Sequence, residues 1–276
     1  METLHIAAFS DGNVGGNPAG VLISEAHPPA TEMQKIANDV GFSETAFGYA
    51  TDGRWRVRYF SPESEVPFCG HATIALGAAL AMQHGDGVYE LELNEANITV
   101  EGRMADGVMS AALQSPPTRN SRLTADQLTG ALQLFALSES DLDERIPPVI
   151  AEAGATHLVL ALKSRDALAA MSYDLDEGRT FMNANGLVTI TLAYMERPDL
   201  FHVRNPFASG GVYEDPATGA AAAALAGYLR DTRRAAGNVI NIVQGEDMGM
   251  RSLLRAEFTD EPGSSIRVSG TARVMA

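Results

Sequence analysis

The sequence contains very little cysteine and comparatively few basic residues. Cys69 is the only cysteine among 276 residues, which excludes an internal disulfide and a zinc site built from several cysteines. Lysine and arginine number 20 against 35 aspartates and glutamates, a formal net charge of −15. Nucleic acids and anionic membranes are bound through clustered lysine and arginine, so neither is expected as a partner.

Long apolar runs and metal-binding spacings are also missing. No stretch approaches the roughly 18 apolar residues of a membrane helix, and the first residues, METLHIAAFSDG, lack the basic and apolar regions of a signal peptide. The histidines show no H-x-H or H-x-x-x-H spacing, so no metal site is predicted. We therefore expect a cytoplasmic protein that acts on a small molecule and needs no cofactor.

The sequence does contain an internal repeat. Residues 65–80 (EVPFCGHATIALGAAL) align without a gap, at an offset of 149, with residues 214–229 (EDPATGAAAAALAGYL). Both segments share Glu-x-Pro-x-x-Gly followed by leucines at helical spacing. The repeat predicts two similar halves, each with a turn that leads into the start of a helix.

The predicted secondary structure of the two halves is also similar. The helices expected at 72–84 and 216–230 are apolar nearly all round, so each must be buried on most sides, as by a curved sheet. No strand–helix–strand unit repeats, which disfavours a Rossmann sheet. We predict an α+β protein of two pseudo-symmetric domains, residues 1–118 and 119–276, each a curved or barrel-like, mostly antiparallel sheet around its central helix.

Other elements follow from local patterns. Asp52-Gly53 predicts a type I′ hairpin, followed by a strand with the arginines 54, 56 and 58 on a solvated face. The pair Pro116-Pro117 marks the predicted domain boundary, and the last strand could return to the first domain. Helices are expected at 31–40, capped by Thr31, and at 125–134, capped by Thr124. Strands are expected at 4–9, 21–23, 54–60, 88–93, 98–100, 107–113, 156–162, 187–193, 200–203, 239–244, 253–258 and 265–274.

The two repeated helix starts are candidate anion sites. Gly70-His71 and Gly219-Ala220 each lie where a turn feeds a helix, and the backbone N–H groups there favour negative charge. Because the acidic surface repels anions at long range, a bound carboxylate would need such local donors. Two starts that face each other could hold one carboxylate; alternatively, the glycines only permit tight turns.

Four side chains near these starts could transfer protons. Glu44 lies among small and apolar neighbours, where desolvation favours proton exchange near neutral pH, although an exposed loop carboxylate is the alternative. His71 is a proton shuttle or a surface cap, and Asp215 is an acid of the site or only a helix cap. Cys69 is a reactive thiol or an inert buried residue. Its counterpart in the repeat is Thr218, which excludes a pair of thiols.

A glycine-rich loop at residues 11–20 lies between the first two predicted strands. It lacks both G-x-G-x-x-G and the Walker lysine, so it is not expected to bind a nucleotide. We interpret it as a substrate-lining or structural loop, with Asn17 as its candidate substrate-binding side chain.

Several segments together resemble the PhzF family of phenazine-biosynthesis-like isomerases. They are GNPAGV (16–21), SETAF (43–47), RYFSP (58–62), EVPFCGHAT (65–73) and EDPATG (214–219), in the same order and over essentially the whole chain. The resemblance implies the fold of the wider diaminopimelate epimerase superfamily: two similar domains, each a sheet wrapped around a central helix, with the active site between them. It also implies a homodimer.

The resemblance further implies roles for particular residues. Glu44 would be the general acid/base, assisted by His71 and Asp215. The backbone N–H groups of Gly70, His71, Gly219 and Ala220 would hold a substrate carboxylate. The family usually has serine at the position of Ala220, so backbone donation is kept here and a hydroxyl contact is lost.

The expected function is a cofactor-independent isomerase that moves a proton on a small unsaturated or cyclic carboxylic acid. One alternative is a racemase, epimerase or dehydratase of the same superfamily that uses Cys69 opposite Thr218. Another is a non-catalytic homologue that only binds a small molecule.

Overall fold

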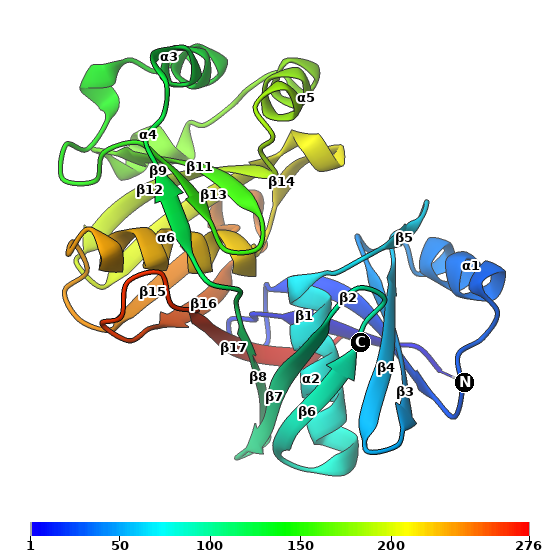
Figure 1. Cartoon of the computed structure of the whole chain (residues 1–276). Coiled ribbons are helices and arrows are strands. Elements are labelled where there is room, and N and C mark those ends of the chain that lie inside the picture. The colour runs from blue at the N-terminus through cyan, green and yellow to red at the C-terminus, as the bar shows by residue number, and fades with distance from the viewer. Residues whose placement is uncertain (1, 276) are drawn as a thin grey trace. The chain divides into compact units, whose positions relative to one another are not determined.

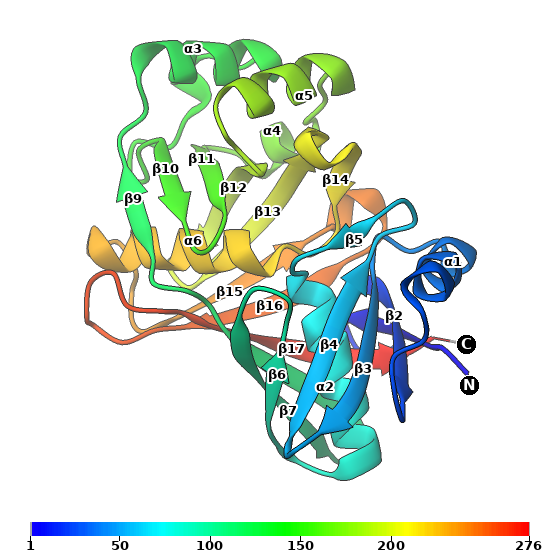
Figure 2. The same cartoon turned by 45° about the vertical axis from the view of Figure 1, so that its right-hand side comes forward.

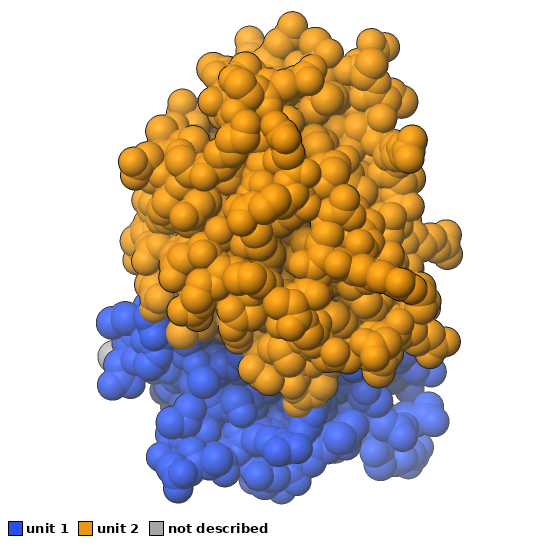
Figure 3. All heavy atoms as spheres, turned by 90° about the vertical axis from the view of Figure 1, so that its left-hand side faces the viewer, with its two compact units in different colours: residues 1–114, 269–276 blue, residues 115–268 orange. Residues whose placement is uncertain are grey.

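The computed structural model describes residues 2–275 of the chain. Contacts divide it into two compact units: unit 1 is Met1–Gln114 with Ser269–Ala276, and unit 2 is Ser115–Val268 (Figure 3). The domain limits expected at residue 118 stay a prediction. None of the helices described in residues 2–275 is both long and apolar enough to cross a membrane.

The strands of unit 1 close into a barrel. They are β1 (Leu4–Ala8), β2 (Asn17–Ser24), β3 (Thr45–Thr51), β4 (Arg54–Phe60), β6 (Gly87–Glu92), β7 (Asn97–Ala105), β8 (Val108–Gln114) and β17 (Arg267–Val274). Each pairs with the next, and β17 closes the ring by pairing with both β8 and β1. The pairs β2–β3 and β4–β6 are parallel.

The central helix of unit 1 is α2 (Gly70–His84), which the strands surround (Figures 1 and 2). Eleven of its fifteen residues are buried, as expected for a helix without a polar face. Helix and sheet approach closely at two glycines, because a Cβ on Gly102 of β7 would lie 2.2 Å from the carbonyl oxygen of Gly77. Outside the barrel, α1 (Ala30–Val40) packs Met33 and Ala37 against β2, β3 and β4.

Unit 2 also has a sheet beside a central apolar helix, α6 (Gly219–Asp231), of which ten of thirteen residues are buried. Its strands pair in the order β9 (Arg119–Ser121), β10 (Val149–Glu152), β11 (Thr156–Leu162), β12 (Thr189–Arg197), β13 (Leu200–Phe207), β15 (Val239–Gln244) and β16 (Ser252–Glu257). The other face of the sheet packs against α3 (Ala125–Leu134), α4 (Arg165–Ala169) and α5 (Leu175–Ala184) in one apolar core.

Strand pairing confirms the predicted pseudo-symmetry. In unit 2 the pairs β11–β12 and β13–β15 are parallel, which matches β2–β3 and β4–β6 in unit 1. A short strand then leads to each central helix: β5 (Glu65–Val66) pairs with β4, and β14 (Val212–Asp215) pairs with β13. The predicted fold class, two curved and mostly antiparallel sheets around apolar helices, is therefore correct.

Local predictions were most accurate where a specific turn or cap was recognised. α3 spans the predicted residues, and Thr124 forms a capping box with Gln127. Asp52 and Gly53 both have positive φ, at 42° and 83°, as a type I′ turn requires.

Several predicted boundaries were wrong, and three of them concern a helix start or the glycine-rich loop. Thr31 lies inside α1, which begins one residue earlier after Pro29 and has no side-chain cap. α6 begins at Gly219 rather than at residue 216, because Thr218 is still extended. The second half of the glycine-rich loop, from Asn17, belongs to β2.

Several short elements were not predicted at all. They are β5, β9, β10, β14, α4, α5 and the 3₁₀ turns η1 (Glu139–Asp141), η2 (Ala208–Gly210) and η3 (Glu246–Met248). Most have fewer than six residues, too few for a hydrophobic period to be recognised.

Candidate active site

In unit 1, Glu44, Cys69 and His71 lie together at the start of α2. Glu44 directly precedes β3, and its carbonyl oxygen accepts a hydrogen bond from Gly20 of β2. Its Oε2 is 3.4 Å from Nε2 of His71, and the Cys69 sulfur is 3.4 Å from Nδ1 of the same ring. Because the Glu44 side chain is 19% exposed while His71 is only 7% exposed, the carboxylate is the accessible end of the cluster.

The start of α2 offers backbone donors. Cys69 is the N-cap, and its side chain makes no capping hydrogen bond. The first intrahelical bond runs from Thr73 N to Cys69 O, at 3.0 Å. Within residues 2–275, no partner is recorded for the N–H groups of Gly70, His71 and Ala72. Three aligned donors and the positive end of the helix dipole make this an anion-binding geometry.

A buried hydroxyl pair holds this turn in place. Thr73 donates a 2.7 Å hydrogen bond to the Cys69 carbonyl oxygen, and its hydroxyl is 2.7 Å from that of Tyr59 on β4. Burial raises the pKa of Tyr59, so its hydroxyl stays protonated. The helix start is thus tied to the barrel wall by uncharged groups.

The start of α6 in unit 2 has the same geometry with different side chains. Thr218 is the N-cap, again without a side-chain cap, and Ala222 N donates to Thr218 O at 3.0 Å. Within the described chain, the N–H groups of Gly219, Ala220 and Ala221 have no recorded partner. The N-cap of this helix is thus Thr218 and not Asp215, whose Oδ2 accepts a hydrogen bond from the Thr218 hydroxyl at 2.5 Å.

Gln244, a buried residue that sequence reasoning missed, organises this second start. Its Oε1 accepts Thr218 N at 3.1 Å. Its Nε2 donates to the Asp215 carbonyl oxygen at 2.7 Å and to the Thr218 hydroxyl at 3.0 Å. A glutamine at the end of a strand gives no sequence signal for such a role.

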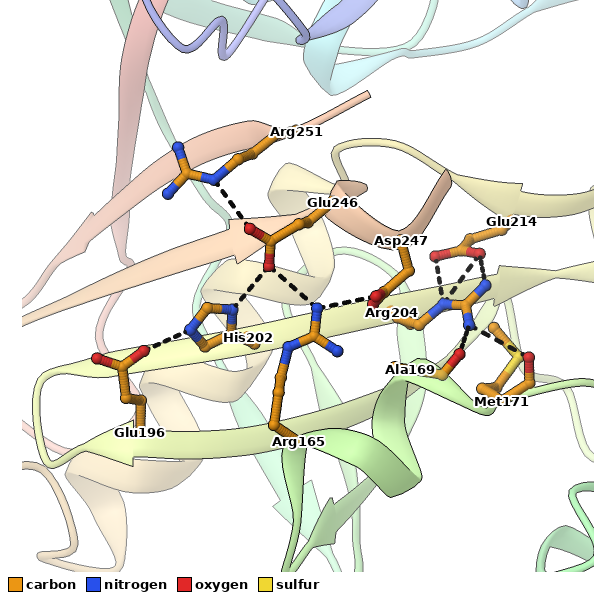
Figure 4. Close-up of polar contacts among 10 residues, drawn as sticks. All are labelled: Arg165, Ala169, Met171, Glu196, His202, Arg204, Glu214, Glu246, Asp247 and Arg251. Carbon is orange, nitrogen blue, oxygen red and sulfur yellow. Dashed lines mark hydrogen bonds and ion pairs between the residues drawn. The ribbon is translucent and has the colours of Figure 1, made fainter. Parts of the chain in front are cut away.

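An arginine–glutamate pair precedes each central helix and explains the repeated glutamates. Arg58 Nε and a terminal nitrogen donate to the two Glu65 oxygens at 2.7 and 2.6 Å. In unit 2, Arg204 forms the same two-pronged pair with Glu214 (Figure 4). The prediction of a solvated face was wrong for Arg58, whose hydrogen bond lowers the pKa of Glu65 and fixes β5 to β4.

The repeat also shows where the units differ. Phe47 pairs with Arg58, and Leu192 pairs with Arg204, so Glu44 corresponds to Thr189. The Thr189 hydroxyl lies 2.7 Å from Nδ1 of His157, a fully buried residue whose burial lowers its pKa to about 4. Unit 2 therefore has a neutral pair where unit 1 has an accessible carboxylate.

The remaining predicted site residue, Asn17, lies in unit 1 at the first position of β2. It is 2% exposed and stands opposite Ala8 of β1. The structure thus places Asn17, Glu44, Gly70 and His71 in unit 1 and brings Glu44 and His71 together. Asp215, Gly219 and Ala220 belong to unit 2. Their roles toward a substrate stay predictions.

Comparisons with known proteins indicate the family of this chain. A family model described as phenazine biosynthesis-like protein (PhzC-PhzF) matches residues 6–276. The trans-2,3-dihydro-3-hydroxyanthranilate isomerase of Pseudomonas fluorescens is 31% identical, over 96% of this chain and 94% of that protein. The uncharacterized isomerase YddE of Escherichia coli (strain K12) is 27% identical, over 99% and 96%.

Solved structures show the same fold. A phenazine biosynthesis protein of the PhzF family from Bacillus anthracis superposes with a TM-score of 0.88 at 21% identity, covering 100% of this chain and 98% of that one. A probable proline racemase from Agrobacterium radiobacter gives 0.66 at 11% identity, covering 99% and 91%.

Fold and relatives together define an isomerase built on two epimerase-like halves. The chain belongs to the PhzC-PhzF family of phenazine biosynthesis-like proteins. This favours an enzyme over the non-catalytic binding homologue considered above.

Proposed function

We propose that this isomerase moves a proton within a small unsaturated or cyclic carboxylic acid by general acid/base catalysis, without a cofactor. The observation that carries the proposal is the Glu44–His71 contact of 3.4 Å at the start of α2, beside backbone N–H groups without a recorded partner within residues 2–275. A base next to anion-binding donors is what proton abstraction near a carboxylate requires.

In the proposed reaction, Glu44 removes a proton from one carbon of the substrate. The electron pair of the broken C–H bond enters the conjugated system, where the carboxylate held by the N–H groups of Gly70 and His71 stabilises the developing charge. Glu44 then returns the proton to a second carbon of the same system. The His71 ring holds the Glu44 carboxylate in position, and Asn17 contacts the substrate.

In unit 2, we propose that Asp215 assists proton transfer and that the N–H groups of Gly219 and Ala220 bind the substrate. Ala220 has no hydroxyl, so any hydrogen bond there comes from the backbone. The substrate named for the Pseudomonas fluorescens relative is a cyclic, unsaturated amino acid, which makes it the first compound to test.

Deuterium incorporation tests the proposal directly. The purified protein is incubated in D₂O with trans-2,3-dihydro-3-hydroxyanthranilate and a panel of other unsaturated amino and hydroxy acids. We expect double-bond migration or carbon-bound deuterium with at least one compound, and a loss of about 10²–10⁴-fold in kcat for Glu44→Gln. Glu63→Gln, at an exposed glutamate of unit 1, is the control of equal charge change. Unchanged turnover in Glu44→Gln would refute the role of this carboxylate.

The alternative chemistry uses Cys69 and Thr218, which are the N-caps of α2 and α6. The 3.4 Å contact between the Cys69 sulfur and His71 favours it, because an adjacent imidazole can activate a thiol. Cys69→Ala separates the two reactions. A loss of activity as large as that of Glu44→Gln would indicate the thiol, whereas near-normal turnover would leave Glu44 as the base.

A further inference from the structure

The cluster at the start of α2 also has the composition of a transition-metal site. One sulfur of Cys69, one ring nitrogen of His71 and one carboxylate oxygen of Glu44 all lie within 4.8 Å of one another. It is the one such group of three found among residues 2–275. All three side chains come from unit 1, two of them from the turn that begins α2.

The spacing fits a tetrahedral ion. Zinc bonds of about 2.0–2.1 Å to nitrogen and oxygen and about 2.3 Å to sulfur, at tetrahedral angles, separate the ligand atoms by roughly 3.3–3.6 Å. Here Nε2 of His71 is 3.4 Å from Oε2 of Glu44 and 3.9 Å from the Cys69 sulfur. Both separations from His71 lie within a few tenths of an ångström of these values, and the Cys69 sulfur and a Glu44 oxygen lie within 4.8 Å of each other.

The donor types select the kind of metal. A thiolate and an imidazole suit zinc and similar ions, whereas magnesium and calcium prefer oxygen ligands. Three protein ligands leave one position of the tetrahedron open to water or another ligand. The partly exposed Glu44 side chain gives an ion a way in. Spacing rules that seek paired histidines do not find this set, because its glutamate is distant in sequence.

We propose that Cys69, His71 and Glu44 bind one Zn²⁺ ion, and that the bound ion inhibits the enzyme. The metal binding stands on the geometry alone. The inhibition rests on the proposed function, because a carboxylate that coordinates zinc cannot also accept a proton from the substrate.

Cobalt is the probe for binding. The reduced, chelator-treated protein is titrated with Co²⁺, which gives a sulfur-to-metal charge-transfer band when a thiolate coordinates it, and Zn²⁺ is then added to displace it. Since Cys69 is the only cysteine, such a band can come from no other residue. We expect one Co²⁺ per chain, with the band absent in Cys69→Ser.

The other two ligands are tested by affinity. Glu44→Gln and His71→Ala should each weaken Co²⁺ binding at least about tenfold, since even changes outside the ligand shell cost about 10–100-fold. Glu63→Gln should leave it unchanged, and thermal unfolding confirms that each variant is folded. No charge-transfer band in the wild-type protein, or full affinity in both Glu44→Gln and His71→Ala, would overturn the site.

Turnover separates the two parts of the proposal. One equivalent of Zn²⁺ should abolish activity in the wild-type protein, and a chelator should restore it. If the cobalt band forms but the metal-loaded enzyme keeps full activity, the metal site stands while the inhibition and the role of Glu44 both fail. If inhibition occurs without a band, zinc acts elsewhere and the site is refuted.

Discussion

At the scale of single residues, Gln244 shows how one buried amide can organise a helix start. It is 1% exposed and satisfies a donor of Thr218 and an acceptor of Asp215 together. Gln244→Leu would remove the hydrogen bonds that the glutamine side chain makes to these two partly buried backbone groups. We expect the free energy of unfolding to fall by about 1–3 kcal/mol, measured by urea denaturation.

Gln133→Leu is the matched control for this change, since Gln133 is exposed on α3 and should tolerate leucine within about 0.5 kcal/mol. If the two variants were equally stable, the Gln244 hydrogen bonds would contribute nothing.

A second residue-scale prediction concerns His157. Burial lowers its pKa from 6.5 to about 4, so the unfolded chain binds a proton at this residue more readily than the folded one. Below pH 6.5, protonation therefore favours unfolding, and this contribution costs about 1.4 kcal/mol per pH unit until about pH 4. In His157→Gln, the free energy of unfolding should depend less steeply on pH across this window.

The comparison requires denaturation curves at several pH values between 4 and 7. His84→Gln serves as control for the substitution itself, because His84 is an exposed histidine at the end of α2. Equal slopes in the wild type and His157→Gln would contradict a neutral, buried imidazole.

At the scale of elements, the two arginine–glutamate pairs allow the effect of burial to be measured within one molecule. The side chains of Arg204 and Glu214 are 9% and 3% exposed, against 23% and 29% for Arg58 and Glu65. Arg204 also donates hydrogen bonds to the carbonyl oxygens of Ala169 and Met171, which hold its guanidinium group in this position (Figure 4).

Neutralising the glutamates should therefore have unequal effects. Glu214→Gln leaves a buried guanidinium without its countercharge, and we expect a loss of about 3 kcal/mol or more in unfolding free energy. Glu65→Gln should cost about 1 kcal/mol, because solvent screens the more exposed pair. Chemical denaturation of both variants at one pH makes the comparison. Equal losses would show that burial does not set the difference.

Elements also show what the sequence could and could not predict. The helix at 125–134 was predicted because Thr124 and Gln127 form a local capping box, and the central helices because they lack any polar face. The repeated Glu-x-Pro-x-x-Gly led to both helix starts. Gln244 was not predicted because its partners lie 26 and 29 residues away in the sequence, and the Arg204–Glu214 pair was not predicted because it forms between the paired strands β13 and β14.

For the candidate site, the sequence likewise predicted individual residues but not the contacts between them. Glu44 was singled out by its apolar neighbours and His71 by its place after Gly70, but their contact depends on how β3 lies against the start of α2. Sequence spacing also could not show that Cys69 lies close to Glu44 and His71. The sequence therefore predicted no metal site, although the ligand atoms of these three side chains lie within 4.8 Å of one another.

At the scale of the whole molecule, the chain's last strand completes its first unit. β17 pairs with β1 at Ile6–Val274, Ala7–Arg273 and Ala8–Ala272, and it also pairs with β8.

A chain that ends at Val268 would leave β1 and β8 with unpaired edges and open the barrel around α2. We expect this truncated protein to aggregate or lose cooperative unfolding of unit 1, and to lose Co²⁺ binding at Glu44, Cys69 and His71. A chain lacking only Ala276 should behave as the wild type. Calorimetry and light scattering on both would decide, and a folded, metal-binding protein ending at Val268 would show that the barrel does not need its closing strand.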